Sequence, residues 1–227
     1  LYAGGVVFND VFDADLDAVE RLERAIPSGL VPKKEAIYFG TILMLIGITL
    51  AFKTTVLSGL ISIALTVAIL TYDGYFKQFG FAGPLNMGIC RGLNLLMGMS
   101  ILGSLTHWYI SLVPVVYIFA ITLISRGEVH GDNKKHIVWA GILYAIVILS
   151  ITLIVMQQKD NLLVLLPFIL MFGFLIYSPL IKAYKVNSPK NIKKAVMGGV
   201  LSLIVMNACW VAGFSNWYLA LAVLLLL

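Results

Sequence analysis

The sequence is a succession of long apolar segments separated by short polar joints. Seven such segments can be identified, at residues 36–52, 56–71, 92–106, 111–124, 137–156, 162–181 and 195–213. Most approach the roughly 20 residues that a helix needs to cross the hydrocarbon core of a bilayer, and flanking residues can complete the shorter ones. Inside hydrocarbon a helix satisfies its own backbone hydrogen bonds. We therefore predict an all-α, polytopic bundle of transmembrane helices.

The composition excludes an ordinary soluble protein. Of the residues, 60% are hydrophobic and 12% are charged, and the mean hydropathy is +0.97. Residues 1–8 are apolar but too short to span a bilayer, and the final WYLALAVLLLL ends within an apolar run. We therefore expect residues 1–227 to form a single transmembrane domain that is truncated at both ends and lacks at least one N-terminal helix.

Charged residues crowd alternate joints of the chain. Of the 16 lysines and arginines, all but Lys53 and Lys159 lie in one set of joints or beside it, which the positive-inside rule makes cytoplasmic. Acidic residues contribute little to that rule, yet Asp160 is the exception among 11 acids that otherwise lie on the same side. The net charge of +5 is thus a topology signal that also suits membrane lipid, and we expect no nucleic-acid partner.

The stretch FNDVFDADLD, residues 8–17, concentrates four aspartates in an otherwise apolar chain. If it is helical to about Ala25, three of them share one face, namely Asp10, Asp13 and Asp17, and Arg24 lies two turns beyond. Asp15 points elsewhere. Like charges at these spacings repel, and a bound cation would relieve the repulsion. A hydrated helix end that binds nothing is the alternative interpretation.

Carboxylates together with the amide of Asn9 are oxygen ligands that suit Mg²⁺, which commonly shares its coordination with waters and substrate phosphates. In ISRGEVHGDNKKH, residues 124–136, Glu128 and Asp132 are four residues apart and share a face if that joint is helical. Two such metal-binding motifs across a cavity would suit a diphosphate.

Several basic and polar residues could complete a diphosphate site. Candidates for contacts with phosphate oxygens are Arg24, Lys77, Arg91 and Arg126. Asn94, three residues after Arg91, could orient the diphosphate or an acceptor. Each has a plainer interpretation, as a charge that sets topology or, for Asn94, as a hydrogen bond between helices.

These motifs resemble those of a known family. NDVFDADLD (9–17) resembles the NDxxDxxxD signature of the UbiA superfamily of intramembrane prenyltransferases, and RAIPSG (24–29) resembles the stretch that follows it. The second motif, usually DxxxD, corresponds to Glu128 and Asp132. TYDGYFK (71–77) is similar to the joint in which the family holds diphosphate with a tyrosine and a lysine, here Tyr72 and Lys77. The resemblance implies a nine-helix bundle that lacks its first helix in this chain.

The resemblance also implies an enzyme that transfers a prenyl group from a polyprenyl diphosphate to a lipophilic acceptor, which we expect to be aromatic. It implies Mg²⁺ as the cofactor, with ligands from Asn9, Asp10, Asp13, Asp17, Glu128 and Asp132. It implies diphosphate binding by Asn9, Arg24, Tyr72, Lys77, Arg91 and Asn94. The catalytic residues would be Asp10, Asp13, Asp17 and Lys77. No covalent intermediate with a side chain is needed.

Two alternatives to this function come from other stretches. GPLNMGICRGLNLLMG (83–98) is similar to the EboC-type branch of UbiA-like proteins, so a non-catalytic protein that binds or moves a lipophilic metabolite is the alternative. Asp73 and Gly74 begin like the signature of the CDP-alcohol phosphotransferases, but Tyr75 to Phe79 do not continue it. We expect a multi-pass protein of a bacterial inner membrane, with both acidic motifs facing the cytoplasm.

Overall fold

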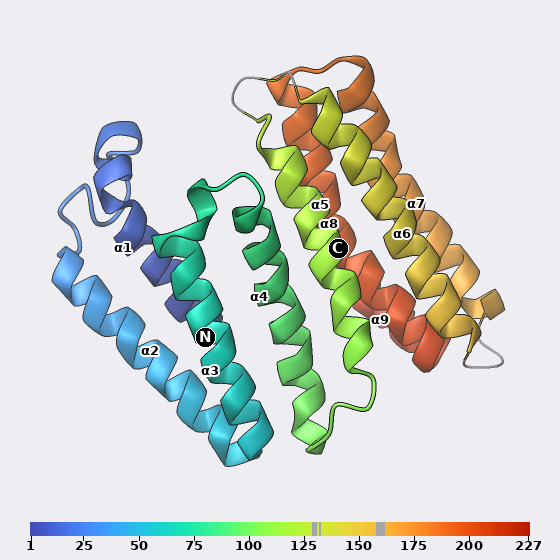
Figure 1. Ribbon diagram of the computed structural model, residues 1–227, viewed down its shortest axis with the longest axis horizontal. Coiled ribbons are helices and arrows are strands. Elements are labelled where there is room, and N and C mark those ends of the chain that lie inside the picture. Colours follow the sequence, from blue (N-terminus) through green and yellow to red (C-terminus); the bar gives the residue numbers. More distant parts are fainter. Residues whose placement is uncertain (129–130, 132, 158–161) are drawn as a thin grey trace. The chain divides into compact units, whose positions relative to one another are not determined.

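The structure is a computed structural model that describes residues 1–227 apart from 129, 130, 132 and 158–161. The described residues form helices and turns, and the prediction of an all-α protein is confirmed (Figure 1). The α-helices are α1 (Tyr2–Glu20), α2 (Lys33–Thr54), α3 (Val56–Gly74), α4 (Ala82–Met99), α5 (Leu112–Ser125), α6 (Lys134–Met156), α7 (Leu162–Lys185), α8 (Pro189–Phe214) and α9 (Trp217–Leu224). The chain divides into two compact units, Leu1–Val115 and Val116–Leu227, which we describe separately.

In the first unit, α3 packs against α1, α2 and α4. A tight turn at Thr55 reverses the chain between α2 and α3, and the Thr55 hydroxyl accepts a hydrogen bond of 2.9 Å from the backbone N–H of Ser58. The Ser58 and Ser100 hydroxyls are 2.7 Å apart. These buried polar contacts fix the start of α3 to the end of α4, where the short 3-10 helix η2 (Ser100–Leu102) begins.

Two glycines allow α4 to approach the first turn of α5. A Cβ atom on Gly88 would lie 2.5 Å from the Val115 carbonyl oxygen, and one on Gly92 would lie 2.6 Å from Val115 Cγ2. Real side chains do not tolerate such distances, so the backbones can meet only because these positions lack a side chain. Small residues serve this purpose at many contacts between membrane helices.

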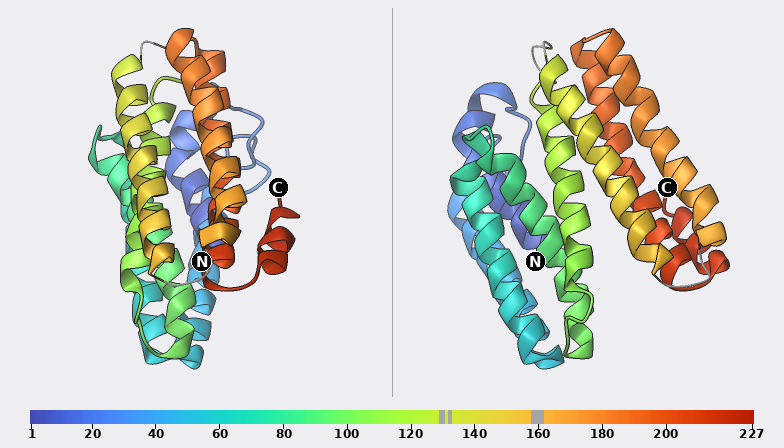
Figure 2. Two further views of the ribbon diagram at one scale, coloured as in Figure 1. Left: turned by 90° about the vertical axis from the view of Figure 1, so that its right-hand side faces the viewer. Right: turned by 45° about the vertical axis from the view of Figure 1, so that its right-hand side comes forward.

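In the second unit, α7 packs against α6 and α8, and α8 also packs against α9 (Figures 1 and 2). Its core is aromatic: the Tyr117 ring centroid is 5.3 Å from that of Tyr144 and 5.4 Å from that of Phe172. All three side chains are fully buried. The Tyr117 hydroxyl donates a 2.7 Å hydrogen bond to the Gly199 carbonyl, which satisfies its polar atom inside the apolar core.

Among the described residues, seven helical stretches are long and apolar enough to cross a membrane, and they correspond to the seven predicted segments. Their outward faces carry large apolar side chains, such as Leu45 at 58% exposure and Leu149 at 57%. Such surfaces suit contact with lipid, because lipid tails are as apolar as these side chains.

Two predicted boundaries are wrong. The third span runs over Ala82–Leu102 and not over 92–106, so Arg91 lies inside α4 and not in a joint. Polar residues such as Asn86 hid the first half of this helix, although a helix tolerates them where they are buried against protein. Helix α1 ends at Glu20 and not near Ala25, because Arg21 leaves the helical conformation with φ −147° and ψ 64°.

Candidate functional site

The α1 helix presents the predicted acidic residues on one face. Asp17 is 4% exposed, whereas the Asp15 side chain is 95% exposed and lies 3.6 Å from Lys33. Asp10 and Asp13 are half-buried. The prediction that Asp15 points away from the other three aspartates is therefore confirmed, since it follows from the 3.6-residue period of the helix.

Arg24 reaches this face by a route that the sequence did not suggest. Because α1 ends at Glu20, the chain turns through residues 21–31, and Val31 N donates to Ala25 O at 3.0 Å. Gly29, with φ +76°, provides a left-handed conformation in this turn. Nη1 of Arg24 pairs with Asp10 Oδ1 and lies 3.6 Å from Asp17 Oδ2. One guanidinium thus contacts two of the three aspartates.

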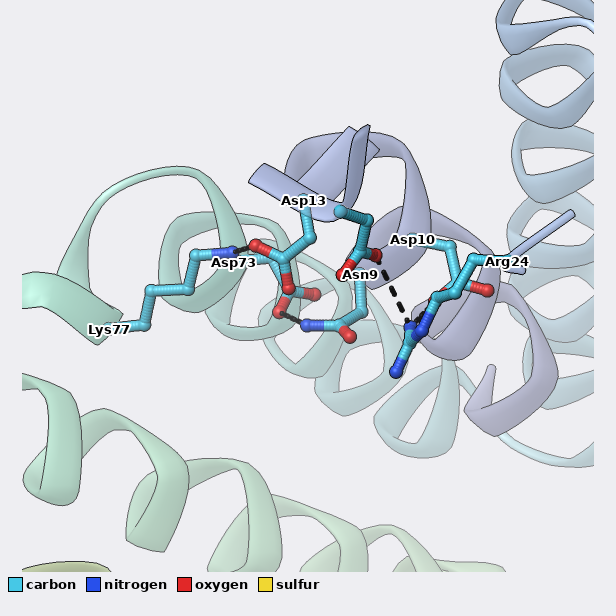
Figure 3. Close-up of polar contacts among 7 residues, drawn as sticks. Asn9, Asp10, Asp13, Arg24, Asp73 and Lys77 are labelled. Carbon is cyan, nitrogen blue, oxygen red and sulfur yellow. Dashed lines mark hydrogen bonds and ion pairs between the residues drawn. The ribbon is translucent and has the colours of Figure 1, made fainter. Parts of the chain in front are cut away.

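Lys77 contacts the third aspartate from another element. It lies in the 3-10 helix η1 (Phe76–Gln78), directly after α3, and its Nζ donates to Asp13 Oδ1 (Figure 3). Both side chains are partly shielded, at 31% and 24% exposure. Of the predicted diphosphate ligands, Arg24 and Lys77 are therefore both brought to the acidic face.

Asp73 is a member of this cluster that the motif comparison missed. It lies in the last turn of α3, is 5% exposed, and accepts a 2.9 Å hydrogen bond from Asn9 Nδ2. It also interacts electrostatically with Lys77 and Asp13. Figure 3 shows Asn9, Asp13, Asp73 and Lys77 together on one side of the cluster and Asp10 with Arg24 on the other. The signal in the sequence was its place inside TYDGYFK, between Tyr72 and Lys77.

The remaining predicted ligands of the first unit lie on α3 and α4. Tyr72 is half-buried near the end of α3, Arg91 is half-buried within α4, and Asn94 is exposed on α4. Within the described part of the chain, the ion pairs of the acidic face come from Arg24 and Lys77, and Arg91 and Asn94 are not among the residues that form them.

The second predicted motif is described only in part. Glu128 is half-buried in the turn that follows α5, and its backbone N–H donates to Ser125 O at 2.9 Å. Gly131 adopts a left-handed conformation with φ +73°, and the predicted shared face of Glu128 and Asp132 stays a prediction because part of this joint lies outside the described residues. Asp132 lies outside the described residues, as does His130.

The oxygen atoms of the α1 face fit a divalent cation by their chemistry. Among the described residues, buried Asp17 Oδ2 has no hydrogen-bond partner and its neighbouring cation is Arg24 Nη1 at 3.6 Å. Asn9 directs its amide nitrogen to Asp73, and none of the described side chains donates to its amide oxygen. Among the described residues no three histidine, cysteine or acidic side chains lie close enough together to hold a metal ion by themselves. Mg²⁺ commonly needs one or two carboxylates and takes its other ligands from water and phosphate, so the donor set suits it.

These features define a class: a multi-pass membrane protein whose polar site combines one acidic helix face with two flanking cations. Residues 1–135 match the model of the UbiA prenyltransferase family. The chain belongs to this family, and it is therefore an integral membrane protein.

The digeranylgeranylglyceryl phosphate synthase of Methanosarcina mazei is 33% identical to this chain over 128 residues, which cover 56% of this chain and 43% of that protein. The synthase of the same name from Saccharolobus solfataricus is 28% identical over 141 residues, 60% of this chain and 50% of that protein. The matched part thus spans half or less of these archaeal relatives.

A solved structure reported for digeranylgeranylglyceryl phosphate synthase superposes with a TM-score of 0.74. It is 19% identical in sequence, and the match covers 93% of this chain and 80% of that chain. The likeness establishes that the two chains share a fold, and it confirms the expected UbiA-type helical bundle.

Proposed function

We propose that this protein binds the diphosphate of a polyprenyl diphosphate at the acidic face of α1 and transfers the prenyl group to a lipophilic acceptor. The observation that carries the proposal is the pairing of Arg24 and Lys77 with Asp10, Asp13 and Asp17 on a partly buried face. Aspartates suit a divalent cation and the two basic side chains suit phosphate oxygens, so one surface offers both kinds of contact. Family membership supports this assignment.

In the proposed reaction, Arg24 and Lys77 hold the diphosphate and neutralise the charge that it gains as it leaves. The bond between the allylic carbon and the diphosphate oxygen breaks, and the oxygen keeps the electron pair. A nucleophilic atom of the acceptor bonds to the allylic carbon and releases its proton to water. Charge on the departing group would be further neutralised by Mg²⁺ when bound to Asn9 and the aspartates of α1. Fixed charges of this kind are often the largest contribution to catalysis.

The roles of the other predicted residues remain proposals. Tyr72, which is half-buried and precedes Asp73 in α3, would contact the diphosphate. Arg91 and Asn94 would do so only if the substrate extends along α4, where both lie. Glu128 and Asp132 would provide the second set of cation ligands. We further propose that the acidic face of α1 is cytoplasmic, as the distribution of basic residues suggests.

For the acceptor, the names of the relatives point to a glyceryl phosphate that carries a prenyl chain. We therefore propose a lipid of this class, with a hydroxyl as the nucleophile. An aromatic acceptor, our expectation from the sequence, gains no support from these relatives, and neither does a bacterial source, since the relatives are archaeal. Because both relatives are synthases, they favour transfer over the non-catalytic EboC-type alternative.

The experiment is a transfer assay with purified protein in detergent. Labelled geranylgeranyl diphosphate and Mg²⁺ are supplied with either geranylgeranylglyceryl phosphate or a phenolic acid. We expect diphosphate release and a doubly prenylated product with the first acceptor, both lost in Asp13→Ala. Binding of the diphosphate without turnover on either acceptor would contradict the proposed transfer and favour the alternative.

A further inference from the structure

Asp73 lies in the same part of the site as Asn9, Asp13 and Lys77 (Figure 3). The family motifs nevertheless give it no role. At 5% exposure it is among the few buried charged residues described in this chain. A carboxylate removed from water is costly unless hydrogen bonds and opposite charges compensate it. Asn9, through a 2.9 Å hydrogen bond, and Lys77, through electrostatic attraction, offset part of this cost, whereas the like charge of Asp13 adds to it. Asp73 therefore belongs to the charged cluster and not to the apolar packing of α3.

The hydrogen bond determines which way the Asn9 amide points. An asparagine side chain has a donor end, the NH₂ group, and an acceptor end, the carbonyl oxygen. An ionised carboxylate can only accept, so the NH₂ group of Asn9 must face Asp73. The Oδ1 atom of Asn9 is then turned away from Asp73. Without Asp73, either end of the amide could face the cation site, and the NH₂ group would repel a cation.

Asn9 and Asp13 are four residues apart on α1 and share a face. Asp73 accepts a hydrogen bond from Asn9 and is close enough to Asp13 for the two like charges to repel, and Figure 3 shows the three side chains together. An outer residue that orients a ligand typically affects metal affinity although it does not touch the metal.

From this geometry we infer that Asp73 is a positioning residue, which orients Asn9 so that its oxygen and the Asp13 carboxylate present themselves to the same divalent cation. The inference rests on the proposed function, because it assumes that a cation and a diphosphate bind at this face. A purely structural role, in which Asp73 fastens α3 to α1, is the interpretation that the experiment must separate from it.

The experiment measures how much Mg²⁺ is needed for purified protein in detergent to bind a thiolo analogue of geranylgeranyl diphosphate, which cannot react. Thermal unfolding without ligand is recorded in parallel. Asp73→Ala is expected to raise the required Mg²⁺ concentration by about 10- to 100-fold, the usual range for such orienting residues. Asp73→Asn keeps an oxygen that can accept from Asn9, and we expect it to lie between the parent protein and Asp73→Ala. Asp15→Asn, which removes an equal charge from the exposed side of α1, is the matched control and should leave the Mg²⁺ requirement unchanged.

A reciprocal exchange tests the contact itself. Asn9→Asp alone places two carboxylates against each other, so it should weaken analogue binding. Adding Asp73→Asn restores a donor opposite an acceptor, with an oxygen at position 9 again free, and should recover part of the binding. These two variants also test the inference if Asp73→Ala fails to fold.

The possible results are distinct. If the Asp73 variants unfold at lower temperature but need the same Mg²⁺ concentration as the parent, Asp73 is structural and the inference is wrong. If the exchange recovers no binding, the hydrogen bond is not what orients Asn9. If the parent protein itself shows no Mg²⁺-dependent binding of the analogue, the proposed function fails and the inference fails with it.

Discussion

Replacing Lys77 by methionine is expected to change the binding of a cation and of a diphosphate in opposite directions. Lys77 Nζ pairs with Asp13, so in the absence of substrate the lysine competes with a divalent ion for that carboxylate. Removing the lysine frees Asp13, and the affinity for the ion alone should rise. The diphosphate, in contrast, loses a charged donor, and its affinity should fall.

The exposure of the pair sets the expected size of both changes. Unit charges about 4 Å apart interact by about 4 kcal/mol at an effective dielectric constant of about 20, whereas fully exposed pairs measure about 1 kcal/mol or less. Lys77 and Asp13 are 31% and 24% exposed and therefore lie between these limits. We expect about 1–2 kcal/mol, which is about 5- to 30-fold in each dissociation constant.

Two titrations measure these constants. In the first, the concentration of free Mn²⁺, a paramagnetic substitute for Mg²⁺, is measured by electron paramagnetic resonance in the absence of diphosphate. In the second, binding of the thiolo analogue is measured by calorimetry at saturating Mg²⁺. The matched control is Lys33→Met, which removes the same charge from an exposed pair with Asp15 at 3.6 Å. The competition is refuted if both affinities of Lys77→Met move in the same direction, or if Lys33→Met reproduces the two changes.

Three further predictions concern the acidic face of α1, the turn that follows α1 and the packing of α4. Asp13→Asn should abolish Mg²⁺-dependent binding of the analogue in calorimetry, whereas Asp15→Asn should leave it unchanged, because Asp13 lies on the acidic face of α1 and Asp15 does not. Equal behaviour of the two variants would disprove the helical-face argument. Arg24→Lys keeps the charge but loses the planar group that reaches both Asp10 and Asp17, so the analogue should bind about tenfold more weakly, a loss of about 1.4 kcal/mol. Gly88→Ala places a Cβ atom 2.5 Å from Val115 O and should lower the free energy of unfolding by about 1–3 kcal/mol. Gly98→Ala, with no atom within 4 Å of its Cβ position, should have little effect, and unfolding in detergent compares the two.

The spans and the acidic face were predictable because each depends on a local rule. Apolar length predicts a membrane helix, and the helical period places Asp10, Asp13 and Asp17 together without reference to any other element. The position of Lys77 was available from TYDGYFK. The resemblance assigned it to the diphosphate, but its contact with Asp13 joins residues 64 positions apart and was seen only in the structure.

The errors arise where tertiary contacts decide the structure. Arg24 reaches Asp10 because α1 stops at Glu20 and the chain turns back, whereas a continued helix would have carried it away. Arg91 was expected in a joint because polar residues in the first half of α4 made the span, which begins at Ala82, appear to begin later. Asp73 was missed because what marks it as a site residue is its hydrogen bond with Asn9, which is 64 residues away in the sequence.

The formal charges of the site agree with the proposed binding of a divalent cation. The aspartates at its centre are Asp10, Asp13, Asp17 and Asp73, and the cations that contact them are Arg24 and Lys77. Counted as ionised, these six described residues carry a net charge of −2, which one divalent cation would balance. Asp15 and Lys33 compensate each other outside the cluster and do not change this balance. Once a divalent ion neutralises the aspartates, Arg24 and Lys77 are no longer needed there, and their charges become available to a diphosphate. Cation and diphosphate binding should therefore reinforce each other, with Asp73 contributing both to the charge and to the orientation of Asn9.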